Sequence, residues 1–274
     1  MVGDDDLDAV LEELNAEFEG RVKVVDNELF LGMRVRRSPD GTVSLDQRHY
    51  AQSILDRFFP DGLNGAQTPL DSSYQTIEAA TEDEHFDCPY RELLGALVYL
   101  TSCTRPDLAF AVAYASRFAA CPAERHWSLL KRICRFLRYT VSLALVYSAP
   151  EHPADAGFRP EQLRGYTDAD HAADRETRRS VGGYVFVVGD PLDASTAISW
   201  ASRRQRSVAI SSTESEYMAL SEAAREGVWL RQLLGELGFT PSTPTRILGD
   251  NTGSLLLACV PGWIPATQWH LPDL

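Results

Sequence analysis

The sequence predicts an α/β protein, α+β overall, whose second half carries a mixed sheet. The strongest observation is segment 213–237, where apolar residues recur at the spacing of one helix face. Three short apolar runs precede it, at 163–168, 181–188 and 196–201, and have the length and composition of strands. A strand at 245–249 and a short helix after it complete the expected order β-β-β-α-β-α.

Residues 1–75 predict a small α+β unit. Its expected elements are a helix at 6–19, a hairpin of 21–25 with 28–36, and a candidate third strand at 42–45. Asp46 is expected to cap a second helix, because its carboxylate accepts hydrogen bonds from free N–H groups of the first turn. Pro60 ends this helix, since proline cannot continue the hydrogen-bond ladder.

Residues 76–148 predict a helical unit. Three helices are expected there, at 89–103, 106–119 and 123–140. Pro106 and Pro122 stand at helix starts, where the missing N–H of proline has no cost. Residues 149–162 are rich in proline and glycine and predict a linker. The last domain then covers 163–274.

The composition excludes several classes of protein. A chain of 274 residues with 44% hydrophobic residues can bury a core and is not a disordered tail. Its five cysteines form no C-x-x-C pair and are odd in number, which favours reduced thiols in an intracellular protein. No segment approaches the roughly 18 apolar residues of a membrane span, and the acidic N-terminus is unlike a signal peptide. We therefore expect a cytoplasmic or nuclear protein with no membrane partner.

The net charge of −13 counts against nucleic acid as a partner, because Lys and Arg supply most non-specific affinity for phosphates. Two basic clusters oppose this: Lys131, Arg135 and Arg138 on one helix face, and Arg203, Arg204 and Arg206 at an expected hairpin turn. The hairpin is expected because 207–210 reads as a further strand or as the partner of 196–201. An ordinary solvated face is the alternative for the first cluster.

Three carboxylates stand at the edges of regular elements in the second half. Asp168 ends an apolar strand, Glu216 lies in the first turn of the long helix, and Asp250 follows the strand at 245–249. At about 100° per residue Glu216 heads the inward apolar stripe of its helix, whereas Glu214 lies on the opposite side. Separate elements would thereby bring three acids to one metal site.

Each of these acids also has a purely structural interpretation. Thr213 and Glu216 fit a capping box, which satisfies free N–H groups at a helix start. Asp170 lies two residues beyond Asp168 on the same strand face and is a rival for its role. Asp250 would serve equally as the N-cap of the short helix that follows it.

Five motifs in order resemble the ribonuclease H domain of copia-type retrotransposon polyproteins: GYTDAD at 165–170, SVGGYV at 180–185, ISW at 198–200, SSTESEYMAL at 211–220 and GDN at 249–251. Upstream, YRELLGALVYL at 90–100 and TRPDLAF at 104–110 resemble the connection region of the same family. FLGM at 30–33 and QRHYA at 47–51 resemble the end of its reverse transcriptase. The resemblance implies an incomplete ribonuclease H-like mixed sheet, preceded by a reverse-transcriptase thumb or connection remnant.

The resemblance also implies a chemistry. Asp168, Glu216 and Asp250 would ligate Mg²⁺, or Mn²⁺, for hydrolysis of the RNA strand of an RNA·DNA hybrid. The family's polymerase metal site precedes a glycine that Gly3 matches, so no DNA polymerase activity is expected, and the missing polymerase portion is a candidate partner. The family's fourth carboxylate has no match here, so we expect weakened activity. The alternative is an inactive remnant that binds nucleic acid or a protein.

Overall fold

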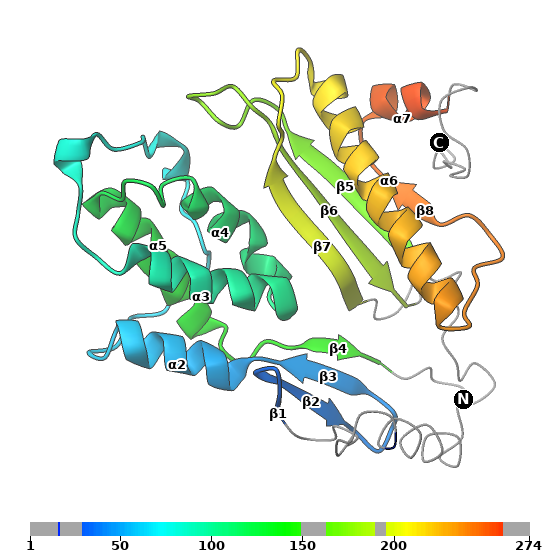
Figure 1. The fold of residues 1–274 in the computed structure, drawn as a ribbon, viewed down its shortest axis with the longest axis horizontal. Helices are drawn as coiled ribbons and strands as arrows, with labels where there is room; N and C mark the ends of the chain where they lie inside the picture. Colours follow the sequence, from blue (N-terminus) through cyan, green and yellow to red (C-terminus); the bar gives the residue numbers. More distant parts are fainter. Residues whose placement is uncertain (1–15, 17–28, 149–162, 190–195, 260–274) are drawn as a thin grey trace.

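The computed structural model describes residues 29–148, 163–189 and 196–259, together with Ala16. The expected helix at 6–19, apart from Ala16, and the expected strand at 21–25 and linker at 149–162 lie outside the described residues. Two sheets and a group of helices make up the described part (Figure 1). This arrangement confirms the predicted class, α+β overall.

The first sheet is antiparallel and has the order β1-β2-β3-β4. Its strands are β1 (Leu29–Phe30), β2 (Met33–Arg37), β3 (Val43–Asp46) and β4 (Leu145–Tyr147). The third strand expected at 42–45 is confirmed as β3. Strand β4 was not predicted. It comes from the end of the helical unit and pairs with β3, so that Leu45 lies opposite Leu145.

The prediction of a single strand at 28–36 is wrong, because the chain reverses within it. Leu31 and Gly32 have positive φ angles of 49° and 72°. Two consecutive residues of this kind form the tight turn that suits a two-residue hairpin, and Phe30 therefore pairs with Met33. Leucine rarely adopts a positive φ, so the sequence carries only the glycine as a sign of the turn.

The helices of the first half follow the predicted ranges closely. They are α2 (Arg48–Phe58), α3 (Tyr90–Cys103), the short turn η3 (Pro106–Leu108), α4 (Ala109–Ser116) and α5 (Glu124–Tyr139), with short turns η1 (Tyr74–Thr76) and η2 (Glu82–Glu84). The expected cap Asp46 lies one residue too early, because Gln47 is the N-cap of α2. The carboxylate of Asp46 nevertheless accepts a hydrogen bond of 3.0 Å from the backbone N–H of Arg48 at the start of the helix. Ile54 of α2 shares one buried core with Leu97 of α3 and Leu130 of α5. Among the described residues no helix has the length and hydropathy needed to cross a membrane.

The second sheet is mixed and has the order β7-β6-β5-β8. Its elements are β5 (Arg164–Asp170), β6 (Val181–Val188), β7 (Thr196–Arg204), α6 (Ser212–Glu236), β8 (Arg246–Leu248) and α7 (Thr252–Ala258). Strands β5, β6 and β7 are antiparallel, while β8 runs parallel to β5. Helix α6 packs across β5 and β6, and α7 lies beside α6 (Figure 1). The expected order β-β-β-α-β-α is confirmed.

The strand or hairpin partner expected at 207–210 is wrong. These residues form a loop from β7 to α6, in which Val208 is 50% and Ile210 is 92% exposed. Their apolar character resembles that of a strand, but β7 is the last strand of its sheet and they pair with nothing in it. Because β7 continues to Arg204, the arginines expected at a hairpin turn lie instead at and just beyond a strand end.

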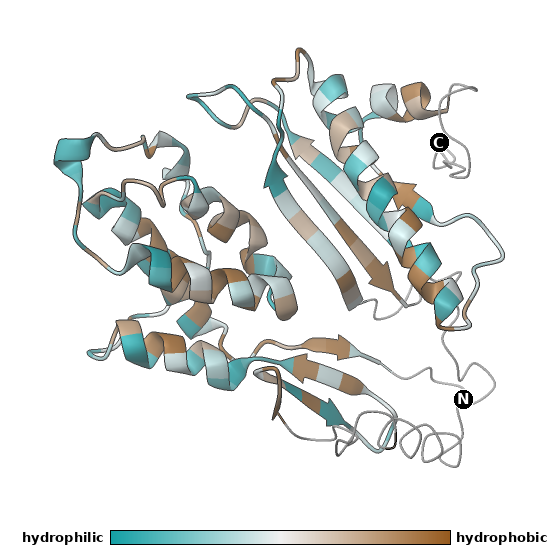
Figure 2. Cartoon of the chain, viewed as in Figure 1, coloured by the Kyte–Doolittle hydropathy of each residue, from teal (hydrophilic) through white to brown (hydrophobic). Residues whose placement is uncertain are grey.

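The core of the second sheet lies between its strands and α6. Phe186 is fully buried, and Leu220, Ala223 and Leu230 of α6 pack into the same cluster as Ile247 of β8. The hydrophobic colouring is accordingly strong on the strands β6 and β8 (Figure 2). The apolar stripe predicted for the long helix therefore faces the sheet.

The two halves of the chain contact each other through β7 and the loop after β5. The indole N–H of Trp200 in β7 donates a hydrogen bond of 2.6 Å to the backbone oxygen of Thr101 in α3. The hydroxyl of Tyr147 in β4 donates one of 3.0 Å to the backbone oxygen of Ala197. The edge strand β7 is thus covered by the first half, which protects it from pairing with other chains.

Gly165→Ala is expected to destabilise the fold, because there is no space for a methyl group on β5. An added Cβ would lie 2.8 Å from the ring of Phe186, and that ring is itself 3.2 Å from the position of a Cβ on Gly227. Overpacking of this kind costs about 1–3 kcal/mol, which lowers Tm by about 2–4 °C per kcal/mol in a protein of this size. Thermal unfolding followed by circular dichroism measures the change.

The matched control is Gly95→Ala in α3. Gly95 is exposed, and an added Cβ would have no heavy atom within 4 Å. Alanine in a helix interior is more stable than glycine by about 0.5–1 kcal/mol, so this variant should unfold at a slightly higher temperature. An unchanged Tm for Gly165→Ala would show that Phe186 can move and that the core is less tightly packed than its distances indicate.

Candidate metal centre

Asp168 lies in β5, two residues before the strand ends. It is paired with Gly183 of β6, and one of its carboxylate oxygens accepts a hydrogen bond of 2.8 Å from the N–H of Ala169. The side chain is exposed. The rival acid Asp170 ends the same strand and is not part of the group of carboxylates described below. Of the two acids on β5, Asp168 is therefore the one that belongs to the candidate metal centre.

Glu216 is the fifth residue of α6, just after its first turn, and has only 8% of its surface exposed. The alternative role of this residue, in a capping box with Thr213, is wrong. The N-cap is Ser211, whose hydroxyl accepts a hydrogen bond from the N–H of Glu214, while the carboxylate of Glu214 accepts one of 2.6 Å from Ile210. Glu214 therefore serves the helix start and leaves the carboxylate of Glu216 available.

Asp250 follows β8 and precedes α7. Its alternative role as the N-cap of α7 is also wrong, because Asn251 holds that position and accepts a hydrogen bond of 2.9 Å from the N–H of Ser254. Strand β8 is parallel to β5. Asp250 therefore leaves the sheet at the same end as Asp168.

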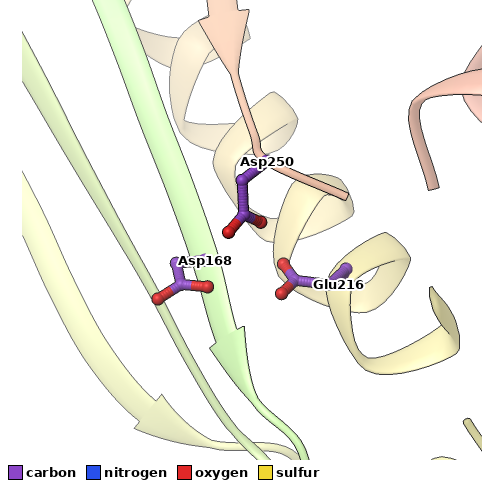
Figure 3. A group of neighbouring side chains, drawn as sticks. All are labelled: Asp168, Glu216 and Asp250. Atoms are coloured by element: carbon purple, nitrogen blue, oxygen red, sulfur yellow. The ribbon is translucent and has the colours of Figure 1, made fainter. Parts of the chain in front are cut away.

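The structure brings these three carboxylates together (Figure 3). One oxygen from each of Asp168, Glu216 and Asp250 lies within 4.8 Å of the other two. Two oxygens on opposite sides of one Mg²⁺ ion are about 4.2 Å apart, since each bond is about 2.1 Å long. Carboxylate oxygens are the hard ligands that Mg²⁺ and Mn²⁺ prefer. The donor set and its spacing fit a divalent cation of this type.

The charge on Glu216 is unfavourable in the chain alone. Burial is the main cause, and the negative charges of Asp168 and Asp250 add to it, while a backbone hydrogen bond from Ala169 opposes it. The net effect is that the pKa of Glu216 rises to about 7. A cation between the three carboxylates would remove the repulsion, because each acid would then face a positive charge. The electrostatics of the group therefore favour cation binding.

The basic residues proposed for nucleic acid lie in two separate places. On α5, Lys131 is exposed, whereas Arg135 donates a hydrogen bond of 3.0 Å to the backbone of Asn64 and Arg138 donates one of 3.3 Å to Gln52. Helix α5 lies in the helical unit, away from β5, α6 and β8, the elements that carry or directly precede the three carboxylates (Figure 1). The guanidinium groups of Arg135 and Arg138 thus contribute to holding the first half together.

The other cluster lies at the same end of the second sheet as Asp168, with β6 between them. Arg203 is exposed at the end of β7, and Arg204 forms an ion pair of 2.6 Å with Asp174. Asp174 is fully buried and was not singled out from the sequence. Its partners come from distant segments, since Arg117 at the end of α4 also binds it at 2.6 Å. The only sequence signal for this arrangement was the segment 174–179, in which two acids lie among three arginines.

Comparison with known proteins gives two kinds of relative, while no family model matches the chain. The chain is 37% identical over 215 residues to a retrovirus-related Pol polyprotein from transposon TNT 1-94 of Nicotiana tabacum, covering 76% of this chain and 15% of that protein. It is 34% identical over 241 residues to the corresponding polyprotein from transposon RE2 of Arabidopsis thaliana, covering 86% of this chain and 15% of that protein.

The second kind of relative is short. The secreted RxLR effector protein 161 of Plasmopara viticola is 47% identical over 142 residues, which is 52% of this chain and 91% of that protein. The chain spans about a seventh of the length of the two polyproteins but nearly all of this smaller relative. Identity to the Pol polyproteins extends over most of the chain, in agreement with the order of motifs along it. The chain therefore belongs to the copia-type retrotransposon Pol polyprotein family.

Proposed function

We propose that this chain hydrolyses the RNA strand of RNA·DNA hybrids, as the ribonuclease H part of a copia-type Pol-derived protein. The observation that carries the proposal is the meeting of Asp168, Glu216 and Asp250, from β5, α6 and the end of β8, with oxygens within 4.8 Å of one another. Three grouped acids that come from three elements, none of them the N-cap of α6 or α7, are typical of a metal-dependent hydrolase.

In this proposal Asp168, Glu216 and Asp250 hold Mg²⁺ or Mn²⁺. Such ions, when bound, activate a water molecule and stabilise the leaving oxygen of a phosphodiester. The chain's own contribution is to fix the ligands. The N–H of Ala169 orients one oxygen of Asp168, and burial near the start of α6 restricts Glu216. Fixed ligands need no rearrangement when charge develops on the phosphate.

Arginines at the same end of the sheet would bind the phosphates of the substrate. Arg175 and Arg178 in the loop after β5, and Arg203 and Arg206 at and beyond the end of β7, are all exposed. The pairing of Asp170 with Val181 and of Val181 with Arg204 places both loops at one end of the sheet. Positive charge beside the acids would offset the net charge of −13 where a nucleic acid approaches.

A cleavage assay on defined duplexes tests the proposal. The purified chain is incubated with an end-labelled RNA·DNA hybrid, an RNA duplex and a DNA duplex of the same sequence, with Mg²⁺, with Mn²⁺ or with a chelator. We expect cleavage of the RNA strand in the hybrid alone, and only with a metal ion. The DNA strand and the DNA duplex lack the 2′-hydroxyl that distinguishes RNA from DNA, and the RNA duplex tests whether a DNA strand is needed opposite the RNA. A folded chain that binds the hybrid but cuts no strand with either ion would refute the nuclease.

The second candidate is a protein that binds nucleic acid or a protein partner without cleaving anything. It is favoured by the relative called a secreted effector, of which the chain covers 91% of the length. Binding to the hybrid measured against salt concentration separates the two kinds of partner. Phosphate contacts give a steep loss of affinity as salt rises, whereas a protein-binding module would show no affinity for the hybrid.

A further inference from the structure

The buried carboxylate of Asp174 connects three segments that are far apart in the sequence. Its two oxygens receive Arg117 from the end of α4 and Arg204 from the end of β7, each at 2.6 Å. Asp174 itself lies in the loop between β5 and β6, and accepts further hydrogen bonds of 3.2 Å from the N–H groups of Glu176 and Thr177. A buried acid with this many donors fixes the position of every group that binds it.

The guanidinium of Arg117 lies close to two aromatic rings of its own segment. It lies 4.8 Å from the ring centre of Tyr114 and 5.7 Å from that of Phe118, and the side chain of Arg117 is only 17% exposed. Tyr114 is anchored in turn by a hydrogen bond of 2.8 Å from its hydroxyl to the backbone oxygen of Tyr74. The helical unit therefore presents the positive charge to Asp174 from a rigid support.

The contacts continue from Asp174 toward one of the metal-binding acids. Arg204 is followed by Gln205, which is 5% exposed and whose N–H donates to the backbone oxygen of Ser180 at 2.8 Å. The side-chain amide of Gln205 donates a hydrogen bond of 2.8 Å to the backbone oxygen of Ser215 in the first turn of α6. Ser215 is the neighbour of Glu216. The end of β7 thus holds the helix turn that carries the buried ligand.

The contacts also reach the other strand of the centre. The loop that Asp174 fixes begins directly after β5, which carries Asp168. Ala172 and Arg178 in this loop have positive φ angles of 54° and 57°, which non-glycine residues adopt only when their surroundings hold them there. The N–H of Ala172 donates to the hydroxyl of Ser180 at 3.0 Å and closes the loop.

We infer that Asp174 is a positioning residue through which the helical unit sets the distance between Asp168 and Glu216. The inference rests on the proposed function, because it gives that distance a role in metal binding. Residues that hold metal ligands in place, without touching the metal, change metal affinity by about 10–100-fold when they are lost. The helical unit thus acts on the metal centre through the contacts Arg117–Asp174–Arg204–Gln205–Ser215.

The test uses the full chain and two measurements at a temperature well below unfolding. Asp174→Asn keeps the shape and removes the charge, and Arg117→Leu removes its partner on α4. For both variants we expect Mn²⁺ affinity, measured by calorimetry, to fall at least about tenfold. We also expect faster amide hydrogen exchange in residues 211–216, which do not touch Asp174. Arg117→Lys, which restores a positive charge, should recover part of both losses.

The matched control is Asp107→Asn, which removes an ion pair of 2.7 Å with Arg105 inside the same helical unit. It should lower Tm but leave Mn²⁺ affinity and exchange at 211–216 unchanged. Gln205→Met serves if Asp174→Asn does not fold, because it breaks only the last contact to Ser215 and should give the same two changes. A double-mutant cycle of Arg117→Leu with Gln205→Met then shows whether the two act together, since independent residues give additive effects.

The outcomes separate the inference from the proposed function. If the parent chain binds no Mn²⁺, the nuclease proposal fails, and the exchange at 211–216 still decides whether Asp174 holds the first turn of α6. If the parent binds Mn²⁺ and the folded Asp174 and Gln205 variants bind it equally well, the inference is overturned. Faster exchange confined to residues 172–180 would overturn it as well, because the loop would then move without the helix.

Discussion

Asp168→Asn is expected to reduce metal-dependent cleavage of the RNA strand by about 1000-fold or more. Asparagine has the same shape as aspartate, but its single side-chain oxygen is neutral, so the charged oxygens left at the centre to hold a cation are those of Glu216 and Asp250. Metal ions supply several kcal/mol of transition-state stabilisation in phosphodiester hydrolysis, and each 1.4 kcal/mol is about tenfold in rate. Initial rates on a labelled hybrid, with Mg²⁺ at saturation, measure the effect.

Asp170→Asn provides the control on the same strand. Asp170 is also exposed, lies two residues further along β5 and is not one of the three grouped carboxylates. Its loss changes the net charge of the chain by the same amount, so general electrostatic effects on substrate binding are matched. We expect its rate to stay within about threefold of the parent, on the order of a surface substitution. Equal losses in the two variants would mean that the strand binds substrate by charge alone and that Asp168 has no special position.

The spacing of residues on α6 made Glu216 predictable. Its apolar stripe placed Glu216 on the buried face and Glu214 away from it, and the structure buries Glu216 together with Leu220, Ala223 and Leu230. Periodicity succeeds here because a helix of this length must turn one face to the sheet. The choice between a cap and a ligand could not be made in the same way. It depended on which of several neighbouring polar residues begins the helix, and Ser211 does so.

Features that depend on distant partners were not predictable. Strand β4 has three residues, and its pairing with β3 joins positions about 100 residues apart. The apolar run at 207–210 has the composition of a strand, but no strand of the described residues pairs with it. Asp174 carried little signal, because its partners Arg117 and Arg204 come from other elements. Local sequence patterns specify the helices well and say little about which distant segments meet.

Glu216→Gln should stabilise the metal-free chain at pH 8 and remove its response to metal. The pKa of Glu216 is about 7 in the fold against 4.5 for an ordinary glutamate. Between pH 4.5 and 7 the unfolded chain releases a proton that the folded chain keeps, so stability falls as pH rises, and the full cost is present above pH 7. That cost is on the order of 3 kcal/mol, and glutamine avoids it. Tm at pH 8 should therefore rise by several degrees without metal, while Tm at pH 4 should change little.

Mg²⁺ should reverse the order of the two Tm values at pH 8, so that the parent unfolds at a higher temperature than Glu216→Gln. In the parent, a cation binding only the folded chain raises Tm in proportion to the logarithm of its concentration, and Glu216→Gln should lose most of this increase. Glu214→Gln is the matched control two residues away. It keeps an oxygen that can accept the hydrogen bond from Ile210, so both its Tm at pH 8 and its response to Mg²⁺ should match those of the parent. A parent chain whose Tm ignores Mg²⁺ and Mn²⁺, or a Glu216→Gln variant that is no more stable than the parent at pH 8, would show that the three carboxylates do not repel one another strongly enough to need a cation.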